Sequence, residues 1–410
     1  TKIVCLAGRL NEHGKLEVLG VGKSKSLGVK RGIVNNIMQT VESINHAADK
    51  LENEFGIKVQ SVCTGIAGQH IRSVQHSDYI TRNNPEKYID KLDIEELHEQ
   101  VKKLILLPGE EIIHVLAQEY KIDGQTDISQ PEGMHGSRLE ANFHIVAGQT
   151  AAIKNITKCV VESGLTVNAL NLEPLASADA VLSPEEKEAG VVLIDIGGGT
   201  TDVAIFKNGI IKHTAVIPFG GNVITEDIKE GCSILQKDAE LLKIRFGSAV
   251  PSENKESEIV SIPGLRGRDP KEISLKNLSK IIKARVEEIM DQVYRQITAY
   301  GFQEGKNKLI GGIVLTGGGS QLKHIKQLTE YITGMPTRIG YSNEHLCKGT
   351  LEDIKNPSFA TSVGLVLRGL KTNNFQDIQD AKQNVLTTTS DSTFFENWSK
   401  KFLQYLLNEK

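Results

Sequence analysis

This 410-residue sequence has little excess charge of either sign. Lysine and arginine number 48 against 51 aspartate and glutamate, which leaves a formal net charge of −3, and no basic stripe is interleaved with aromatic residues. A nucleic-acid-binding protein needs a basic face to contact phosphates, so we expect no nucleic-acid partner. The length favours two or more domains with buried cores.

Long hydrophobic runs and paired cysteines are also missing. Aliphatic runs such as 104–107 and 191–194 are far shorter than the roughly 20 residues that cross a bilayer. Residues 1–8 lack the basic region and apolar stretch of a secretory signal. The five cysteines are scattered and form no CxxC pair, which argues against a zinc site and favours a reducing, cytosolic setting.

What the sequence does contain is the apolar spacing of an α/β protein. Strands over residues 3–7 and 16–21 are predicted to form a hairpin, followed by a helix over 37–55 and a strand over 59–66. Residues 73–148 are more polar and indicate a small α+β insertion.

The second half continues the alternation of strands and helices. Its predicted elements are strands over 191–195, 203–206 and 210–218 and helices over 224–231, 237–246, 275–300 and 321–332. Residues 251–270 are expected to form a polar loop. After residue 370 the composition is that of a polar tether, and residues 393–410 regain helical character.

The most informative motif lies between two predicted strands. It is Asp195-Ile196-Gly197-Gly198-Gly199-Thr200-Thr201-Asp202. Consecutive glycines let main-chain N–H groups close around an anion, the threonines add hydroxyl donors, and a carboxylate at a strand end suits hydrated Mg²⁺. A plain hairpin turn is the alternative, but such a turn requires neither three glycines nor flanking aspartates. The motif therefore predicts a phosphate-binding loop.

Two common nucleotide motifs are excluded by their spacing. Gly22-Lys23-Ser24 resembles the end of a P-loop, but the first glycine of that motif would fall at Glu17. A dinucleotide-binding fingerprint that starts at Gly317 would need a glycine at Leu322.

A second glycine loop follows the apolar residues 313–316. It is Gly317-Gly318-Gly319, and a helix is predicted after it. Such a loop can lie against a nucleoside, and the helix N-terminus can face its phosphates. A structural turn in an α/β crossover is the alternative.

In this order, the two glycine motifs resemble the second phosphate loop and the adenosine loop of the actin, Hsp70 and sugar-kinase superfamily. Within that superfamily, the chain is most similar to the FtsA family of bacterial cell-division proteins. The similarity covers residues 1–370 and recurs at the tail. It is carried by residues 28–32, 65–68, 173–178, 190–206, 217–221, 315–319 and 358–365.

The resemblance implies an α/β fold of the actin-like, two-lobed ATPase type, with a small inserted α+β subdomain (1C) and a C-terminal amphipathic helix. The implied parts are subdomain IA (1–72, 151–172 and 341–370), 1C (73–150), IIA (173–221 and 291–340), IIB (222–290), a flexible linker (371–392) and a membrane-targeting helix (393–410). The family also has a first phosphate hairpin, of which this chain carries only the end, Thr1-Lys2. We therefore expect IA to be truncated here, which puts the nucleotide affinity of this chain in question.

The same resemblance implies the ligands and the residues that hold them. ATP would lie between the lobes with its phosphates over residues 197–201, and Mg²⁺ would lie near Asp195, held through water. Glu240 and Lys243 would contact the ribose and base, although their i, i+3 spacing also fits a plain ion pair. Glu173 would position the attacking water, or would only stabilise a helix N-terminus. Because the family is usually regarded as hydrolysing ATP weakly, we expect at most weak ATPase activity.

The tail can be interpreted without the resemblance. Its apolar residues share one arc of a helix, with lysines on the polar side, and Thr393 with Glu396 fits a capping box. The residues of that arc are Phe394, Phe395, Trp398, Phe402, Tyr405 and Leu406. An aromatic-rich amphipathic helix on a polar tether predicts insertion into the membrane interface. A helix docked on the body of the protein or on a partner is the alternative.

The function implied by the resemblance is an ATP-binding, filament-forming adaptor that ties the tubulin-like protein FtsZ to the cytoplasmic face of the bacterial inner membrane at the septum. The C-terminal peptide of FtsZ would dock on residues 222–290 beside Arg285, unless Arg285 pairs with Glu288 on its own helix. Later division proteins would bind 1C. A small-molecule kinase and a chaperone-like ATPase of the same superfamily are the alternatives; the first needs a polar substrate pocket and the second a β-rich substrate domain.

Overall fold

The computed structural model describes residues 2–264, 269–302, 308–347 and 352–371. The chain divides into a unit of residues 1–367, which holds the elements named below, and a unit of residues 368–410. The predicted tether and amphipathic helix thus lie outside the described residues.

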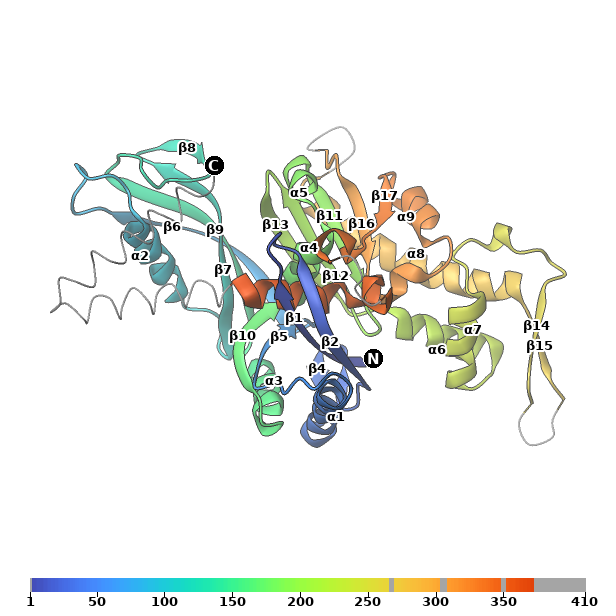
Figure 1. The fold of residues 1–410 in the computed structure, drawn as a ribbon. Coiled ribbons are helices and arrows are strands. Elements are labelled where there is room, and N and C mark those ends of the chain that lie inside the picture. The colour runs from blue at the N-terminus through green and yellow to red at the C-terminus, as the bar shows by residue number, and fades with distance from the viewer. Residues whose placement is uncertain (1, 265–268, 303–307, 348–351, 372–410) are drawn as a thin grey trace. The chain divides into compact units, whose positions relative to one another are not determined.

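A five-stranded sheet in the order β13-β12-β11-β16-β17 carries both glycine motifs (Figure 1). Its strands are β11 (Val191–Ile196), β12 (Thr201–Lys207), β13 (Ile210–Ile217), β16 (Gly312–Thr316) and β17 (Thr337–Ile339). Every residue of β11 and β16 is buried, which explains why both strands read as nearly unbroken apolar runs. These two strands are parallel neighbours, so the glycine loops that follow them lie at the same edge of the sheet.

Helices share one hydrophobic core with this sheet. They are α6 (Gly221–Cys232), α7 (Gln236–Phe246), α8 (Leu275–Ala299) and α9 (Ile325–Thr333). Along α8 the buried residues Leu278, Ile282, Val286 and Ile289 recur at helical spacing and form its core-facing stripe. Within the described ranges, no helix is both long enough and apolar enough to cross a membrane.

The first part of the chain forms its own strands and helices. A hairpin of β1 (Lys2–Leu10) and β2 (Leu16–Lys25) packs against α1 (Ile37–Phe55), which the Asn36 side chain caps at its start and Gly56 ends with φ 70°. The remaining elements are β3 (Val29–Lys30), β4 (Ile33–Val34), β5 (Ser61–Ile66), α3 (Thr150–Glu162), β10 (Thr166–Leu172), α4 (Glu173–Val181) and α5 (Pro184–Ala189). The predicted hairpin and the helix over 37–55 are confirmed.

The insertion is an antiparallel sheet with one helix. The sheet has the order β6-β9-β7-β8, and a separate hydrophobic cluster around Phe143, Leu139 and Leu97 forms its core. Its elements are β6 (Ile71–Thr81), α2 (Lys91–Lys102), β7 (Glu110–Ile122), β8 (Gln125–Ile128) and β9 (Arg138–Gln149). The predicted α+β character of this segment is confirmed.

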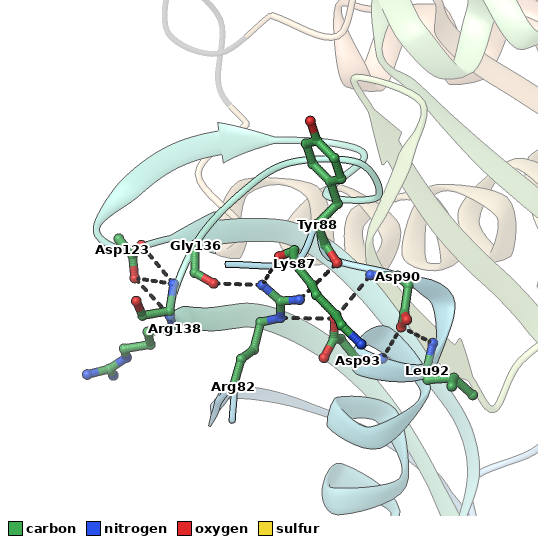
Figure 2. Close-up of polar contacts among 10 residues, drawn as sticks. Arg82, Lys87, Tyr88, Asp90, Leu92, Asp93, Asp123, Gly136 and Arg138 are labelled. Carbon is green, nitrogen blue, oxygen red and sulfur yellow. Dashed lines mark hydrogen bonds and ion pairs between the residues drawn. The ribbon is translucent and has the colours of Figure 1, made fainter. Parts of the chain in front are cut away.

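A buried arginine fastens the loops at one end of the insertion. The Arg82 guanidinium donates to the Asp93 carboxylate and to the carbonyl oxygens of Lys87, Tyr88 and Gly136 (Figure 2). The four hydrogen bonds measure 2.9, 2.9, 2.9 and 2.8 Å in that order. The Arg82 side chain is only 4% exposed. Because every contact is charge-assisted and the guanidinium is almost fully buried, Arg82 joins the segment after β6 firmly to the segment before β9.

Two sequence predictions were wrong in part. Residues 251–270 are not only loop, since β14 (Ile259–Ile262) pairs with β15 (Lys271–Ser274) in a short hairpin. Four-residue strands among charged residues give too little alternation to detect. The helix expected over 321–332 begins only at Ile325, because a 3₁₀ turn occupies Gly318–Gln321 and His324 takes a left-handed φ of 61°. Further 3₁₀ turns lie at Pro251–Glu253, Ser342–His345, Glu352–Lys355 and Pro357–Phe359.

Candidate functional site

The triple-glycine motif forms the turn between β11 and β12. The Gly197 N–H donates to the Thr200 carbonyl oxygen at 2.9 Å. The carbonyl oxygens of Gly197 and Gly198 accept from the N–H groups of Gly221 and Asn222, at 2.9 and 2.8 Å, which ties the turn to the start of α6. Within the described part of the chain, the N–H groups of Gly198, Gly199 and Thr200 have no acceptor. The turn thus offers consecutive main-chain donors to an anion.

The second glycine loop packs directly on the end of β11. Gly317 has a φ of 81°, and a Cβ there would lie 2.3 Å from Asp195 Oδ1. A Cβ on Gly319 would lie 2.3 Å from Ile196 Cγ2, whereas one on Gly318 would meet nothing closer than 4.0 Å. Gly317 and Gly319 are therefore required by close approach. The structure brings Asp195, residues 197–201 and residues 317–319 together, as the sequence analysis expected.

Two hydroxyl groups hold the Asp195 carboxylate in place. Ser177 Oγ on α4 donates to Asp195 Oδ2 at 2.7 Å, and Thr361 Oγ1, from the helical residues 360–367, donates to the same oxygen at 3.1 Å. Ser177 and Thr361 were not among the site residues predicted from the sequence. The one available signal was that both fall in stretches that carry the family resemblance.

Three carboxyl groups are close enough to repel one another. Burial, with a smaller effect of the Asp195 charge, raises the pKa of Glu173 to about 7. Burial also raises the pKa of Asp195, and burial together with the charges of Glu173 and Asp195 raises the pKa of Asp202 well above its usual range. Asp202 Oδ2 accepts from Thr200 Oγ1 at 3.2 Å, but its buried Oδ1 has no hydrogen-bond partner among the described residues.

This carboxyl cluster fits a hydrated divalent cation. A cation would offset the mutual repulsion and satisfy the orphaned oxygen of Asp202. No three His, Cys, Asp or Glu side chains of the described ranges are arranged to ligate a metal directly. The sequence analysis noted Asp202 beside the glycines but gave it no role. Its cross-strand pairing with Asp195 could have been anticipated from the length of the turn.

A cation faces the same cluster from the first strand. Lys2 Nζ donates to Ser358 Oγ at 3.0 Å and lies 3.8 Å from the ring centroid of Phe359. Partial burial and the neighbouring Lys23 lower the pKa of Lys2 to about 8, while the charge of Asp195 acts in the opposite direction. Lys2 was not among the site residues predicted from the sequence, because a single lysine at a strand start carries no spacing signal.

Glu173 is the first residue of α4, so it occupies the helix N-terminus that the sequence alternative described. It also faces the carboxyl cluster, and a Cβ on Gly65 would lie 2.8 Å from Glu173 Cγ. The glycine therefore leaves room for this side chain. Water positioning by Glu173 remains a prediction.

Glu240 and Lys243 form the plain ion pair, at 2.7 Å. Lys243 Nζ also donates to the Gly221 carbonyl oxygen at 2.8 Å and to Thr225 Oγ1 at 2.7 Å. These contacts join α7 to the first turn of α6, which holds the phosphate turn. The structure thus places the pair beside the predicted site, and its contact with a ribose or base remains a prediction.

The other predicted site residues lie elsewhere. Arg285 binds Asp227 through two hydrogen bonds of 2.6 and 2.9 Å and also pairs with Glu288. The intrahelical pair that the sequence analysis named as the alternative is therefore formed. The six apolar tail residues from Phe394 to Leu406 lie outside the described residues.

Replacing Glu173 by glutamine should stabilise the metal-free protein at pH 8 more than at pH 5. The folded pKa is about 7 against an ordinary 4.5, so between these values the unfolded chain loses the proton while the folded chain keeps it, and stability falls as the pH rises. The loss is at most about 1.4 kcal/mol per pH unit in this window, and Glu173→Gln removes it.

Thermal unfolding in EDTA at the two pH values measures this effect. Glu42→Gln, at an exposed position of α1, is the control. It should change the unfolding temperature by the same small amount at pH 5 and at pH 8. An equal response of the two variants to pH would show that Glu173 is not held in the protonated form.

Comparison with solved structures defines the class. The type IV pilus biogenesis complex PilM-PilN matches with a TM-score of 0.61 at 17% identity, over 90% of this chain and 95% of that one. The ethanolamine utilization protein EutJ from Carboxydothermus hydrogenoformans matches with a TM-score of 0.50 at 15% identity, over 89% and 85%. These likenesses concern the fold alone, and the chain has the actin-like ATPase fold.

Sequence comparison gives the family within that class. The family described as "Cell division protein FtsA" matches residues 192–364, and the "SHS2 domain inserted in FTSA" matches residues 68–147. The cell division protein FtsA of Pseudomonas aeruginosa is 38% identical over 90% of this chain and 87% of its own length. FtsA of Neisseria meningitidis serogroup B is 38% identical over 89% of this chain and 87% of its own length. FtsA of Escherichia coli K12 is 31% identical over 98% of this chain and 95% of its own length. The chain belongs to the FtsA family of cell-division proteins.

Proposed function

We propose that this chain is an ATP-binding, filament-forming adaptor that ties FtsZ filaments to the cytoplasmic face of the inner membrane at the division septum. The observation that carries the proposal is the turn at residues 197–200, whose unpaired N–H groups lie beside the carboxyl cluster and the second glycine loop. Unpaired donors at a strand end, next to acidic groups that need a cation, match the requirements of a nucleotide phosphate chain with Mg²⁺.

Each part of the site has a distinct task in this proposal. The N–H groups of the turn and the hydroxyl groups of Thr200 and Thr201 bind the phosphates, and residues 317–319 lie against the adenosine. Asp195 and Asp202 hold Mg²⁺ through water, and the ion, when bound, neutralises phosphate charge. Glu173 orients a water molecule toward the terminal phosphate. Weak ATP turnover is proposed from family membership.

Calorimetric titration of the full chain with ATP, with and without Mg²⁺, tests this part of the proposal. We expect saturable binding that strengthens with Mg²⁺. No measurable affinity for ATP or ADP in the presence of Mg²⁺, both for this chain and for one that begins with a whole first phosphate hairpin, would refute the nucleotide site.

Exposed apolar residues support the proposed partners. On α7, Leu241 is 49% and Ile244 is 67% exposed, so the lobe of residues 222–290 offers an apolar surface for the C-terminal peptide of FtsZ. An acidic group of that peptide would have to displace Asp227 or Glu288 from Arg285. In the insertion, Ile105 is 94% and Leu107 is 60% exposed, which supports contacts there with later division proteins. Self-association into filaments is proposed from family membership.

The apolar face of the tail should carry membrane binding. The double variant Trp398→Glu/Phe402→Glu places charge on that face, whereas Asn397→Glu/Gln404→Glu adds the same charge to the polar face. In sedimentation with anionic vesicles, the bound fraction of the first variant should fall to that of a chain that ends at residue 370. The second variant should retain most of its binding. Equal sedimentation of the full and shortened chains would refute the anchor.

A further inference from the structure

The short hairpin of β3 and β4 has no role in the site described so far. Val29 pairs with Val34 and Lys30 with Ile33, so Arg31 and Gly32 form the two-residue turn, with φ of 52° and 76°. A turn with two left-handed residues favours Asn-Gly or Gly-Gly, because a larger side chain at the first position is strained. The arginine at this strained position therefore indicates that a function of its side chain, rather than the preference of the backbone, accounts for the residue found there.

The tip of this hairpin lies against the phosphate turn. A Cβ on Gly199 would be 3.1 Å from Arg31 Cα, 3.2 Å from its N and 3.7 Å from its Cγ. The φ of Gly199 is not left-handed and so does not require glycine. The close approach of Arg31 therefore explains why position 199 is a glycine. On its other side, the hairpin is fixed by Gly32, where a Cβ would lie 2.0 Å from the Ala67 carbonyl oxygen. Arg31 is therefore held at the turn by backbone packing.

The Arg31 side chain is exposed and, within the described ranges, no carboxylate pairs with it. A guanidinium presents several N–H donors in a planar fork that matches phosphate oxygens. Gly199 lies at the tip of the turn, whereas Gly317 packs against Asp195, which pairs with Asp202 at the base of the turn. A nucleotide that starts at Gly317 would thus bring its last phosphate toward Arg31.

We propose that Arg31 binds the terminal phosphate of a nucleoside triphosphate and so distinguishes ATP from ADP. The inference rests on the nucleotide site proposed above. It adds a residue from the β3–β4 hairpin to the site, and it makes the strength of nucleotide binding depend on the third phosphate.

The test compares the affinities of the full chain and two variants for Mg-ATP and Mg-ADP by calorimetry. Arg31→Asn removes the cation and keeps a residue that tolerates a left-handed φ. Lys30→Gln removes the same charge from the adjacent exposed position and is the matched control. Arg31→Asn should weaken ATP binding about tenfold or more and ADP binding less than threefold, because a charge-assisted contact to one phosphate is lost. Lys30→Gln should change neither affinity.

Each remaining result has a distinct meaning. If the unaltered chain, with or without a whole first phosphate hairpin, binds neither nucleotide, the nucleotide site itself fails, and Arg31 with it. If the unaltered chain binds ATP and Arg31→Asn leaves the ratio of ATP to ADP affinities unchanged, the Arg31 inference alone is wrong. Thermal unfolding without nucleotide should give the same unfolding temperature for Arg31→Asn and the unaltered chain, which shows that the variant is folded.

Discussion

Replacing Asp195 by asparagine should lower the affinity for Mg-ATP at least about tenfold, which is about 1.4 kcal/mol of binding free energy. Asparagine keeps the shape of the side chain, and its amide oxygen can still accept from Ser177 and Thr361. What is lost is the charge that attracts hydrated Mg²⁺. The fold should therefore survive while the Mg²⁺-dependent part of binding does not.

The sign of the effect should reverse without the cation. In EDTA, the Asp195 carboxylate repels the phosphates, so Asp195→Asn should bind free ATP at least as well as the unaltered chain. Asp78→Asn in the insertion removes the same charge outside the site. This variant should change neither the affinity for Mg-ATP nor the affinity for free ATP in EDTA. Equal losses for Asp195→Asn with and without Mg²⁺ would assign Asp195 a structural role only.

Replacing Arg82 by alanine should destabilise the insertion by about 3–5 kcal/mol, the range for removing one partner of a buried ion pair. The change leaves the Asp93 carboxylate and the carbonyl oxygens of Lys87, Tyr88 and Gly136 without their donor (Figure 2). Asp93 and Asp90 also form the capping box of α2, so the start of this helix loses support as well.

Arg138, drawn in the same view, is the control. It is 50% exposed, pairs with Glu140 at 3.2 Å and lies over the ring of Tyr79, so Arg138→Ala should cost no more than about 1 kcal/mol. Urea unfolding gives the two free energies, and hydrogen exchange of β9 amides shows whether the loss is confined to the insertion. Similar costs for the two variants would contradict the fastening role of Arg82.

The sequence predicted well those features that depend on neighbours along the chain. β11 and β16 are apolar because both faces of each strand are buried, and their burial made the strands visible as runs. The helix over 37–55 showed its apolar spacing and its stop at Gly56. The short hairpin of β14 and β15 was missed, because each strand has four residues and the pairing partner lies beyond a loop.

The candidate site was predicted only in part, for the same reason. Its glycines are consecutive in the chain and could be recognised locally. Nothing local showed that Arg31 packs on Gly199, or that Arg285 binds Asp227 across two helices in addition to Glu288 on its own.

By itself, the sequence determined the glycine turns and the strands that present them, since each depends on residues a few positions apart. Only the tertiary structure decided the surroundings of Asp195. Its partners Ser177 and Thr361 lie 18 and 166 positions away in the chain, and the raised pKa values of Glu173 and Asp202 arise from burial and repulsion between separate elements. Burial and mutual distance are properties of the packed chain, so no spacing in the sequence can express them.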